Sequence, residues 1–462
     1  ALAALAALLA APAAAQVEYA PALLVGDAVP GVGLVTAVTD LDVASSGAWV
    51  VSANTDYPDD FANSVVVRDG LLVYREGMTL LDPADHGVNS FGQVYLSPAG
   101  EVATTLYVWP MLGGLNFELV HVAGKELLRV GDLPLGPFLP NSYTFVAFDE
   151  ARQNAQGHVL VHATFDDAFG AQFVEALVRY TLDANGNPLG ELPIAVEGDT
   201  VFGVGGQELI EDLVGGPNQH AFTDTGLAMY QVNLTGPAAT EIAILVSGNL
   251  VAQEGGFSGV PDRPWSNLMF MPADLNDAGH YVVVGEIAGD AATKHLIALD
   301  GQKYVQSGDP VPGVPGATIL NFGQTTPVFV DDQERVLWSA TWLDGGLRKG
   351  LFLGALPIAI EGETEVLGAT VTSLFTFQDG FALAPDGATV LFRATLSDGR
   401  SGAFLATLPG EVAAVPGCFG NPGVLSTTSA PPGIGEAFTV DLGGNPYASA
   451  FGGLYAAGAP AL

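Results

Sequence analysis

The chain has 462 residues, of which 49% are hydrophobic and 14% charged, and its 50 acidic against 14 basic residues give a formal net charge of −36. Such a charge repels phosphate backbones and anionic membrane surfaces, so nucleic acid and membranes are not expected partners. The 59 Gly and 30 Pro follow no Gly-X-Y period, which excludes collagen and indicates many turns.

Residues 1–15, almost all Ala and Leu, have the character of the apolar part of a secretory signal peptide, with cleavage expected near Ala15. Because no initiator Met precedes them, we expect this signal to be incomplete at its N-terminus. The segment is too short to span a membrane. The sequence therefore predicts an exported monomer, secreted or at the cell surface, without a membrane span.

Residues 17–411 are predicted to hold seven tandem units. A Gly next to an acidic residue recurs with 51 to 67 residues between successive glycines. These pairs are Gly26-Asp27, Glu76-Gly77, Gly131-Asp132, Gly198-Asp199, Glu254-Gly255, Gly308-Asp309 and Gly362-Glu363. Further along each unit a second turn residue opens an apolar run, at Gly47, Gly100, Gly157, Gly226, Gly279, Glu334 and Gly387. Repeats at such a period indicate a repeat architecture.

Within each unit, short β-branched runs alternate with turn residues, as β-strands do. Residues 321–363, for example, contain four such runs in up-and-down order. Four strands in a unit of this length are typical of a propeller blade, whereas an immunoglobulin-like sandwich needs about 100 residues. The sequence predicts an all-β, seven-bladed β-propeller of four-stranded antiparallel blades.

The phase of the repeat predicts how the ring closes. The run before Gly26 resembles the fourth-strand run before Gly362, while the seventh unit changes character at Pro409 after three strands. We therefore expect the N-terminal strand to complete the last blade and remove its open edge. The alternative is that residues 411–415 form that strand.

Residues 412–462 are rich in Gly, Pro and Ser and are predicted to form a short C-terminal β module, cut off at Leu462. The segment is too short for a comfortable core of its own. Its Cys418, the only Cys in the chain, either pairs with a cysteine beyond the cut or is a free thiol.

Two units carry an Asn-x-x-Gly turn, at Asn154–Gly157 and Asn276–Gly279, and Gly-Asp-x-x-Pro-Gly joins units at 26–31 and 308–313. With these motifs, residues 20–411 resemble the choice-of-anchor Asn-x-x-Gly repeat group of exported bacterial proteins. The tail from Gly417 resembles a Cys-Gly-Asn-Pro-Gly module of planctomycete-type secreted proteins. The resemblance implies export and extracellular or surface display with no assigned activity. Five of the seven units lack the Asn, and no Pro-Glu-Pro sorting signal is visible.

The sequence holds no Gly-x-Ser-x-Gly elbow, paired-histidine zinc helix or Walker loop, so no catalytic residue is predicted. The acidic members of the first turn lie on one rim of the predicted ring. Equivalent carboxylates of neighbouring blades lie at least about 10 Å apart, because blades stack at that distance. Calcium needs several oxygen ligands, each about 2.3–2.6 Å from the ion, so no two of these carboxylates can share one. These acidic residues are therefore interpreted as turn caps.

An insertion in the third unit spaces Asp183, Asn185 and Asn187 as calcium loops do, although Ile194 stands where an acidic ligand is expected. Asn185-Gly186 is equally a strong hairpin turn. A weak calcium site and a plain hairpin are both retained, and no other cofactor is predicted.

Five Trp lie mostly in or near predicted strands, where packing between blades explains them. Trp265, in a Pro-rich loop, is the candidate for an exposed ring that stacks on a ligand. The leading interpretation is an exported, non-catalytic binding or surface-display propeller for an unknown glycan or protein. One alternative is a glycoside hydrolase or lyase with a pair of channel carboxylates, which a channel filled with Gly, Ala and Val would exclude. The other is a calcium-dependent adhesion protein.

Overall fold

The structure is a computed structural model, and it describes residues 17–59, 62–111, 115–136, 139, 143–167, 173–215, 220–323, 325–408, 426–427 and 440–441. In this part the chain is all-β, with one short 3-10 turn at Ala291–Thr293. None of its helices is long and apolar enough to cross a membrane. The signal segment 1–15, residues 411–415 and Cys418 lie outside the described residues.

The chain divides into two units, residues 19–406 and residues 1–18 with 407–462. In the second unit the described strands are β35 (Ser426–Thr427) and β36 (Val440–Asp441), which pair antiparallel.

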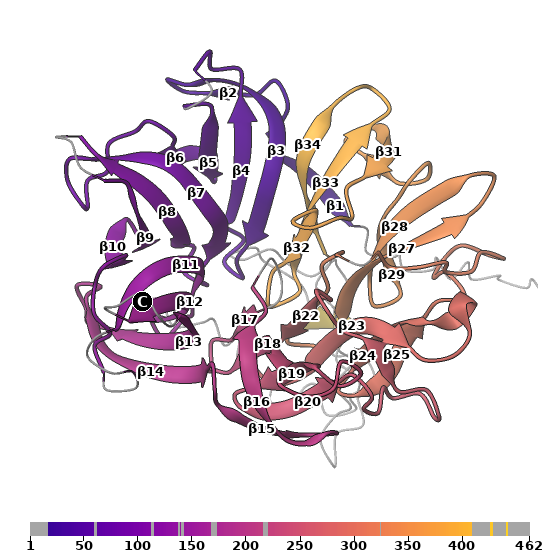
Figure 1. Ribbon diagram of the computed structural model, residues 1–462. Helices are drawn as coiled ribbons and strands as arrows, with labels where there is room; N and C mark the ends of the chain where they lie inside the picture. Colours follow the sequence, from indigo (N-terminus) through magenta and orange to yellow (C-terminus); the bar gives the residue numbers. More distant parts are fainter. Residues whose placement is uncertain are drawn as a thin grey trace, which may run out of the picture. The chain divides into compact units, whose positions relative to one another are not determined.

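Residues 19–406 form a seven-bladed β-propeller of four-stranded antiparallel blades, so the predicted fold class is confirmed. The blades surround a common centre (Figure 1). Blades 1 to 3 have one long inner strand each, and their strands are given from the centre outward. Blade 1 consists of β3 (Gly33–Val43), β4 (Trp49–Thr55), β5 (Ser64–Arg68) and β6 (Leu71–Arg75), and blade 2 of β7 (His86–Leu96), β8 (Val102–Pro110), β9 (Phe117–Val122) and β10 (Lys125–Arg129). Blade 3 consists of β11 (Tyr143–Gln153), β12 (His158–Asp167), β13 (Phe173–Leu182) and β14 (Pro188–Val196).

In blades 4, 5 and 7 the inner strand is broken in two, and in blade 6 it is short. Blades 4 and 5 consist of β16 (Gly206–Leu213) with β17 (His220–Phe222), β18 (Ala228–Leu234), β19 (Ile242–Val246) and β20 (Asn249–Gln253); and β21 (Trp265–Asn267) with β22 (Ala273–Leu275), β23 (Tyr281–Ile287), β24 (His295–Leu299) and β25 (Gln302–Gln306). Blades 6 and 7 consist of β26 (Phe329–Val330), β27 (Val336–Leu343), β28 (Leu347–Leu353) and β29 (Leu356–Ile360); and β31 (Ala369–Leu374) with β32 (Phe381–Leu383), β33 (Thr389–Leu396), β34 (Ser401–Thr407) and β1 (Glu18–Leu24). Three short strands pair antiparallel with the inner strands of blades 1, 4 and 7: β2 (Ala28–Val29), β15 (Thr200–Gly203) and β30 (Glu365–Val366).

The N-terminal strand closes the ring, as predicted. Strand β1 pairs with β34, and Val25 N donates to Ser401 O at 2.8 Å. Tyr19 Oη also donates to Ile358 O of blade 6 at 2.6 Å. In Figure 1 the first strand accordingly lies beside the last ones.

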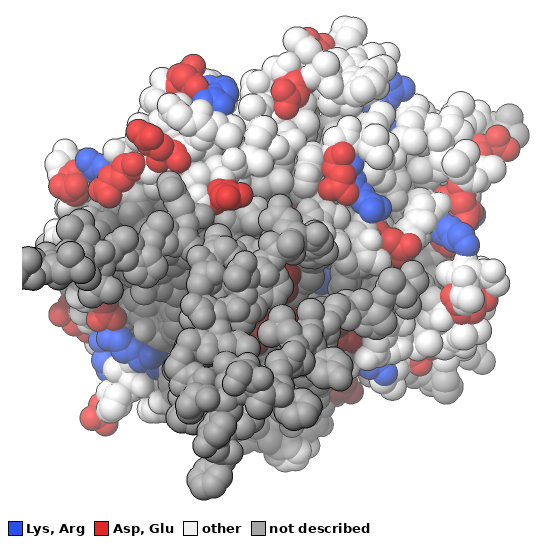
Figure 2. Space-filling model, turned by 180° about the vertical axis from the view of Figure 1, so that it is seen from behind, with Lys and Arg blue, Asp and Glu red and all other residues white. Residues whose placement is uncertain are grey.

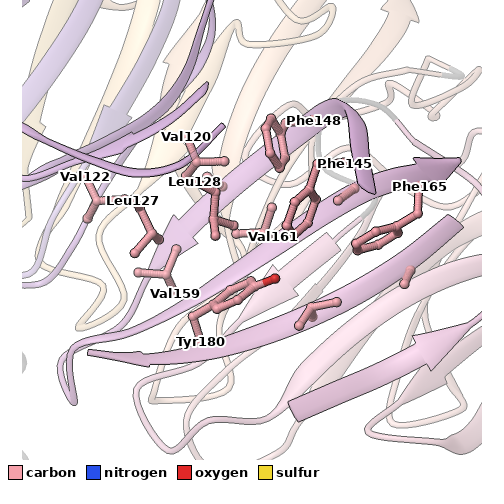
Figure 3. Close-up of a cluster of buried hydrophobic side chains, with 14 of the residues drawn as sticks. Val120, Val122, Leu127, Leu128, Phe145, Phe148, Val159, Val161, Phe165 and Tyr180 are labelled. Carbon is pink, nitrogen blue, oxygen red and sulfur yellow. The ribbon is translucent and has the colours of Figure 1, made fainter. Parts of the chain in front are cut away.

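The core lies between successive blades. At the interface of blades 2 and 3, aromatic side chains of β11, β12 and β13 meet aliphatic side chains of blade 2 (Figure 3). Phe145 and Phe165 lie 4.6 Å apart between ring centroids, and both are buried. Trp338 and Trp342 are likewise buried, in β27. Burial of these apolar side chains holds neighbouring blades face to face.

The two ends of the blades are built differently, and we name them. The turn end carries the hairpins between strands 1 and 2 and between strands 3 and 4 of each blade. The loop end carries the hairpins between strands 2 and 3 and the connections from one blade to the next.

At the turn end, the Asn of the Asn-x-x-Gly motif has two tasks. Asn276 Oδ1 accepts from Ala278 N at 3.1 Å and from His280 N at 2.9 Å, which caps its own turn. Its Nδ2 donates to Asp331 O of the next blade at 2.8 Å. Asn154 Nδ2 makes the equivalent bond to Thr223 O at 3.1 Å. The motif therefore links blades as well as closing a hairpin.

At the loop end, the acidic turns are caps, as interpreted from the sequence. Asp27 Oδ2 accepts from Leu24 N at 2.7 Å, and Asp199 Oδ2 accepts from Val196 N at 2.9 Å. In the last unit, Thr364 Oγ1 accepts from Ile360 N at 2.8 Å in place of an acidic side chain.

Candidate functional site in the central channel

One position on the inner strands, next to the channel, repeats from blade to blade. Asp42, Arg152 and Asp274 occupy it in blades 1, 3 and 5, because each pairs with the residue eight positions later, on strand 2. Tyr95, Ala221 and Phe329 have the same register in blades 2, 4 and 6, and Ala382 of blade 7, which pairs with Leu391 nine positions later, completes the layer of seven. Six of the seven line a cavity of about 140 Å³, the exception being Ala221. Function can lie here because these residues differ between otherwise similar blades.

The cavity reaches from the turn end into the channel. Asp224, Asp277 and Asp332 line it at the turn end, and Gln93 and Asp379 line it deeper in. At the turn end these carboxylates also link blades: Asp277 Oδ1, for example, accepts from Asp224 N at 2.6 Å.

Three aspartates of the cavity are fixed by the backbone of the following blade. Asp40 Oδ2 accepts from Val94 N at 2.9 Å, and Asp42 Oδ2 accepts from Leu96 N at 2.7 Å. Asp274 Oδ2 accepts from Val330 N at 2.8 Å. The carboxyl groups are therefore held in place before any ligand arrives.

Burial raises the pKa of these carboxyl groups. The pKa of Asp274 rises to about 7, and the pKa values of Asp42 and Asp379 rise to about 6. Burial, and then the nearby carboxyl group of Asp379, raise the pKa of Asp40 well above its usual range. Near neutral pH the cavity thus offers both carboxylate acceptors and carboxylic acid donors.

Arg152 is the cation of this layer. Its guanidinium lies 4.0 Å from the ring centre of Tyr95, and its Nε donates to Glu150 Oε1. Burial alone would raise the pKa of Glu150, but Arg152 and His220 outweigh it and lower the pKa to about 2. Arg152 Nη2 has no hydrogen-bond partner among the described residues, although the residue lines the cavity.

A bridge of hydrogen bonds joins blades 2 and 7 at the inner end of the cavity. Tyr95 Oη donates to Gln93 Oε1 at 2.6 Å, and Gln93 Nε2 donates to Asp379 Oδ1 at 3.3 Å. Because Gln93 belongs to blade 2 and Asp379 precedes β32 of blade 7, the bridge spans blade 1. The cavity lining also includes apolar residues, among them Phe222, Phe329 and Phe381.

Trp265 differs from the expectation of an exposed ring. The side chain is 3% exposed and belongs to the core between blades 4 and 5. The Pro-rich segment before it suggested a loop, but Trp265 itself begins β21 and points into the core. In this conformation its ring is not available to stack on a ligand.

Asp183, Asn185 and Asn187 form the hairpin turn between β13 and β14. Asp183 Oδ1 accepts from Asn185 N at 2.8 Å and from Asn187 N at 2.9 Å, and these bonds to Asn187 and Asn185 lower its pKa. Lys125 Nζ donates to Asn185 O. A shallow hollow of about 460 Å³ borders this hairpin. Calcium binding here stays a prediction, and it requires the ion to replace the present donors.

The described residues contain no group of three or more His, Cys, Asp or Glu side chains placed to hold a metal ion. His162 is buried and faces His220 of blade 4, with ring centroids 5.0 Å apart, and burial lowers its pKa to about 3. His220 Nδ1 lies 3.0 Å from Glu150 Oε2, and the other oxygen of Glu150 accepts from Arg152. His220 and Glu150 therefore help to hold the Arg152 side chain in position.

Sequence reasoning missed the channel residues. Asp42, Tyr95, Arg152 and Asp274 each stand five positions before the second turn residue of their unit. Aligning the units on that turn would have brought these polar residues into one column.

Comparison with known proteins adds no family. No family model and no curated protein matches the chain. Among solved structures, a Hadza microbial sialidase has 10% identity and a TM-score of 0.32 over 66% of this chain, which spans 63% of that chain. The polysaccharide lyase PL25, an ulvan lyase, has 10% identity and a TM-score of 0.33, covering 83% of this chain and 96% of that one. TolB from Acinetobacter baumannii has 12% identity and a TM-score of 0.23, covering 70% and 80%. With TM-scores this low, these similarities carry no evidence about function.

Proposed function

We propose that the protein is an exported, non-catalytic binding propeller whose channel cavity takes a small, uncharged polyhydroxy ligand, such as the terminal sugar residue of a glycan. The observation that carries the proposal is the composition of the cavity. Aspartates of several blades, Arg152 and Tyr95 meet there beside the rings of three phenylalanines.

This mixture suits hydroxyl groups better than a single charge. A sugar hydroxyl both donates and accepts, so it pairs with carboxylates and carboxylic acids alike. The Phe rings supply the apolar surface that ligand sites require. A cavity of about 140 Å³ is smaller than the roughly 300–1,000 Å³ of drug-sized sites, which favours one sugar residue over a chain.

Export and extracellular display are part of the proposal. They are supported by the signal-like residues 1–15 and by the resemblance to choice-of-anchor repeat proteins with a planctomycete-type module. They would place the cavity where extracellular glycans are found.

The test is a calorimetric titration of the full chain with a panel of neutral monosaccharides and with their sulfated and uronic counterparts. We expect at least one neutral sugar to bind with a Kd of about 1 mM. Asp274→Asn, which keeps an acceptor for Val330 N, and Tyr95→Phe should each weaken binding by about tenfold.

Asp398→Asn is the matched control, because Asp398 lies in an exposed loop-end turn of blade 7, bonded to Arg400. Binding that survives both channel substitutions, or that Asp398→Asn weakens equally, would refute the cavity as the site. No binding by any sugar would refute the ligand class.

A glycoside hydrolase or lyase is the second candidate. The raised pKa values of Asp42 and Asp274 favour it, since general acids and bases need pKa values near the working pH. Turnover of chromogenic glycosides with a pH profile between about 5 and 8, abolished by Asp274→Asn, would establish this alternative.

A further inference from the structure

A second surface lies at the loop end, away from the cavity opening. The inner strands of blades 5 and 7 are interrupted there, and blade 6 begins its inner strand late. These segments expose Met269, Phe270, Leu320, Phe375 and Phe377, which we name the loop-end patch. Phe377 is 65% and Phe270 is 51% exposed.

The patch is continuous from blade to blade. Its segments occupy equivalent places in three successive blades, and Gln378 N donates to Thr325 O at 3.1 Å, which joins blade 7 to blade 6. Leu343 and Leu347, at the neighbouring hairpin of blade 6, are also exposed. Blades 1 to 3 have long unbroken inner strands at the same place. Apolar side chains are exposed at the loop end of other blades too, among them Leu115, Phe173 and Phe202, but those of the loop-end patch belong to inner-strand segments next to the channel. Exposed apolar side chains grouped in this way mark an interaction site.

Glutamate side chains fix the backbone at the start of two of these segments. Glu254 Oε1 accepts from Leu268 N at 2.9 Å, and Glu361 Oε1 accepts from Leu374 N at 2.8 Å. Phe270 has a backbone φ of 54°, which is costly for a bulky residue. The patch is therefore a fixed surface rather than a frayed loop.

The charge around the patch is acidic. Glu363 and Glu365 lie at the loop end of the same blades, as does Asp309, which is paired with Lys303. The nearby cations are engaged: Arg393 lies 4.6 Å from the Phe375 ring and donates to Thr39 O, and Lys349 Nζ donates to Leu374 O. On the face of the molecule that Figure 2 shows, most of the blue side chains lie beside red ones.

We infer that the loop-end patch binds a basic polypeptide segment that carries apolar anchor residues. Apolar anchors fill the patch while Lys or Arg face the carboxylates around it. A second copy of this chain would bring two acidic rims together, and an anionic membrane would meet the same repulsion. None of the five residues of the patch lines the cavity, although Phe377 stands two positions before Asp379, which does.

The test uses a fluorescent peptide of alternating Lys and Leu, added to the full chain and followed by anisotropy. We expect binding that weakens as NaCl is raised. A Glu/Leu peptide and a Lys/Ser peptide of the same length should bind at least about tenfold more weakly, since the first lacks the basic charge and the second lacks the apolar anchors.

The double variant Phe375→Ser/Phe377→Ser should weaken binding by about tenfold or more. The single variant Phe377→Ser, at a largely exposed position, covers the case in which the double variant misfolds. Leu71→Ser and Leu356→Ser remove exposed leucines at the turn end and should leave binding unchanged.

Equal binding of the Glu/Leu peptide, equal loss in the turn-end variants, or unchanged binding by Phe377→Ser would overturn the inference. Self-association of the chain that Phe377→Ser abolishes would overturn it in favour of a homodimer. Binding to anionic vesicles with the same dependence on Phe377 would overturn it in favour of a membrane.

Discussion

Asp274 shows how one residue joins stability to the proposed function. Its carboxyl group accepts a backbone hydrogen bond from the next blade and also lines the cavity. Because burial raises its pKa to about 7, the folded chain holds this proton more tightly than the unfolded chain. Its contribution to stability is therefore largest below the unfolded pKa of about 4 and is lost as the pH rises through about 7.

Asp274→Asn tests this linkage. Asn keeps an acceptor for Val330 N but has no charge to bury, so we expect the variant to unfold at a higher temperature than the wild type at pH 8. The gain should be of the order of 1–3 kcal/mol and should vanish near pH 4. Thermal melts across this range provide the measurement. A variant that is less stable at pH 8 would contradict the pKa assignment.

Asn276, at the turn end, also has two roles, since its side-chain amide caps a hairpin and links two blades. Asn276→Ala removes two acceptor bonds and one donor bond of a buried side chain, so we expect a loss of about 2–4 kcal/mol in the free energy of unfolding. Urea unfolding measures it. Asn249→Ala, at an exposed turn where the side chain donates only to Val246 O, is the control and should cost far less.

Among the elements, strand β1 is the one that closes the ring, because it completes blade 7 from the other end of the chain. Gly402 of β34 allows this approach. A Cβ at Gly402 would lie 2.4 Å from Leu23 O and 2.7 Å from Leu24 Cα, and its φ is 148°. Any side chain there must push β1 away.

Gly402→Ala is therefore expected to loosen β1. Limited proteolysis should cut within residues 18–25 faster than in the wild type, with a stability loss of about 2 kcal/mol or more. Gly346→Ala is the control, because nothing lies within 4 Å of a Cβ at that turn. Equal cleavage in the two variants would mean that β1 contributes little to the closed ring.

The elements were easier to predict than the site, and particular residues explain why. Gly279 and Asn276 determine a turn through local backbone chemistry, so the four-stranded units and the phase of β1 follow from the sequence. The cavity depends on which side chains from distant blades meet, and Asp42 and Asp274 look like ordinary polar residues in their own strands. Trp265 misled because its neighbours are loop-like, whereas its burial depends on packing between blades 4 and 5.

At the scale of the whole molecule, the net charge of −36 opposes the compact state. Many carboxylates are bonded to backbone amides, which orders them but does not remove their mutual repulsion. We expect added NaCl to raise the melting temperature by a few degrees at pH 8, because salt screens repulsion over about 10 Å at 0.1 M. At pH 4, where many carboxylates are protonated, the gain should be smaller. Melting that falls with NaCl at pH 8 would contradict this.

Closure by the first strand also sets an order of events during synthesis. Of the propeller strands, β1 leaves the ribosome first, yet its partner β34 is among the last to be made. Until then the apolar side of β1 has no blade to join, and the growing ring keeps an unpaired edge that favours aggregation. We therefore expect chaperones or delayed folding to protect the nascent chain from association with other chains until nearly the whole propeller has been translated.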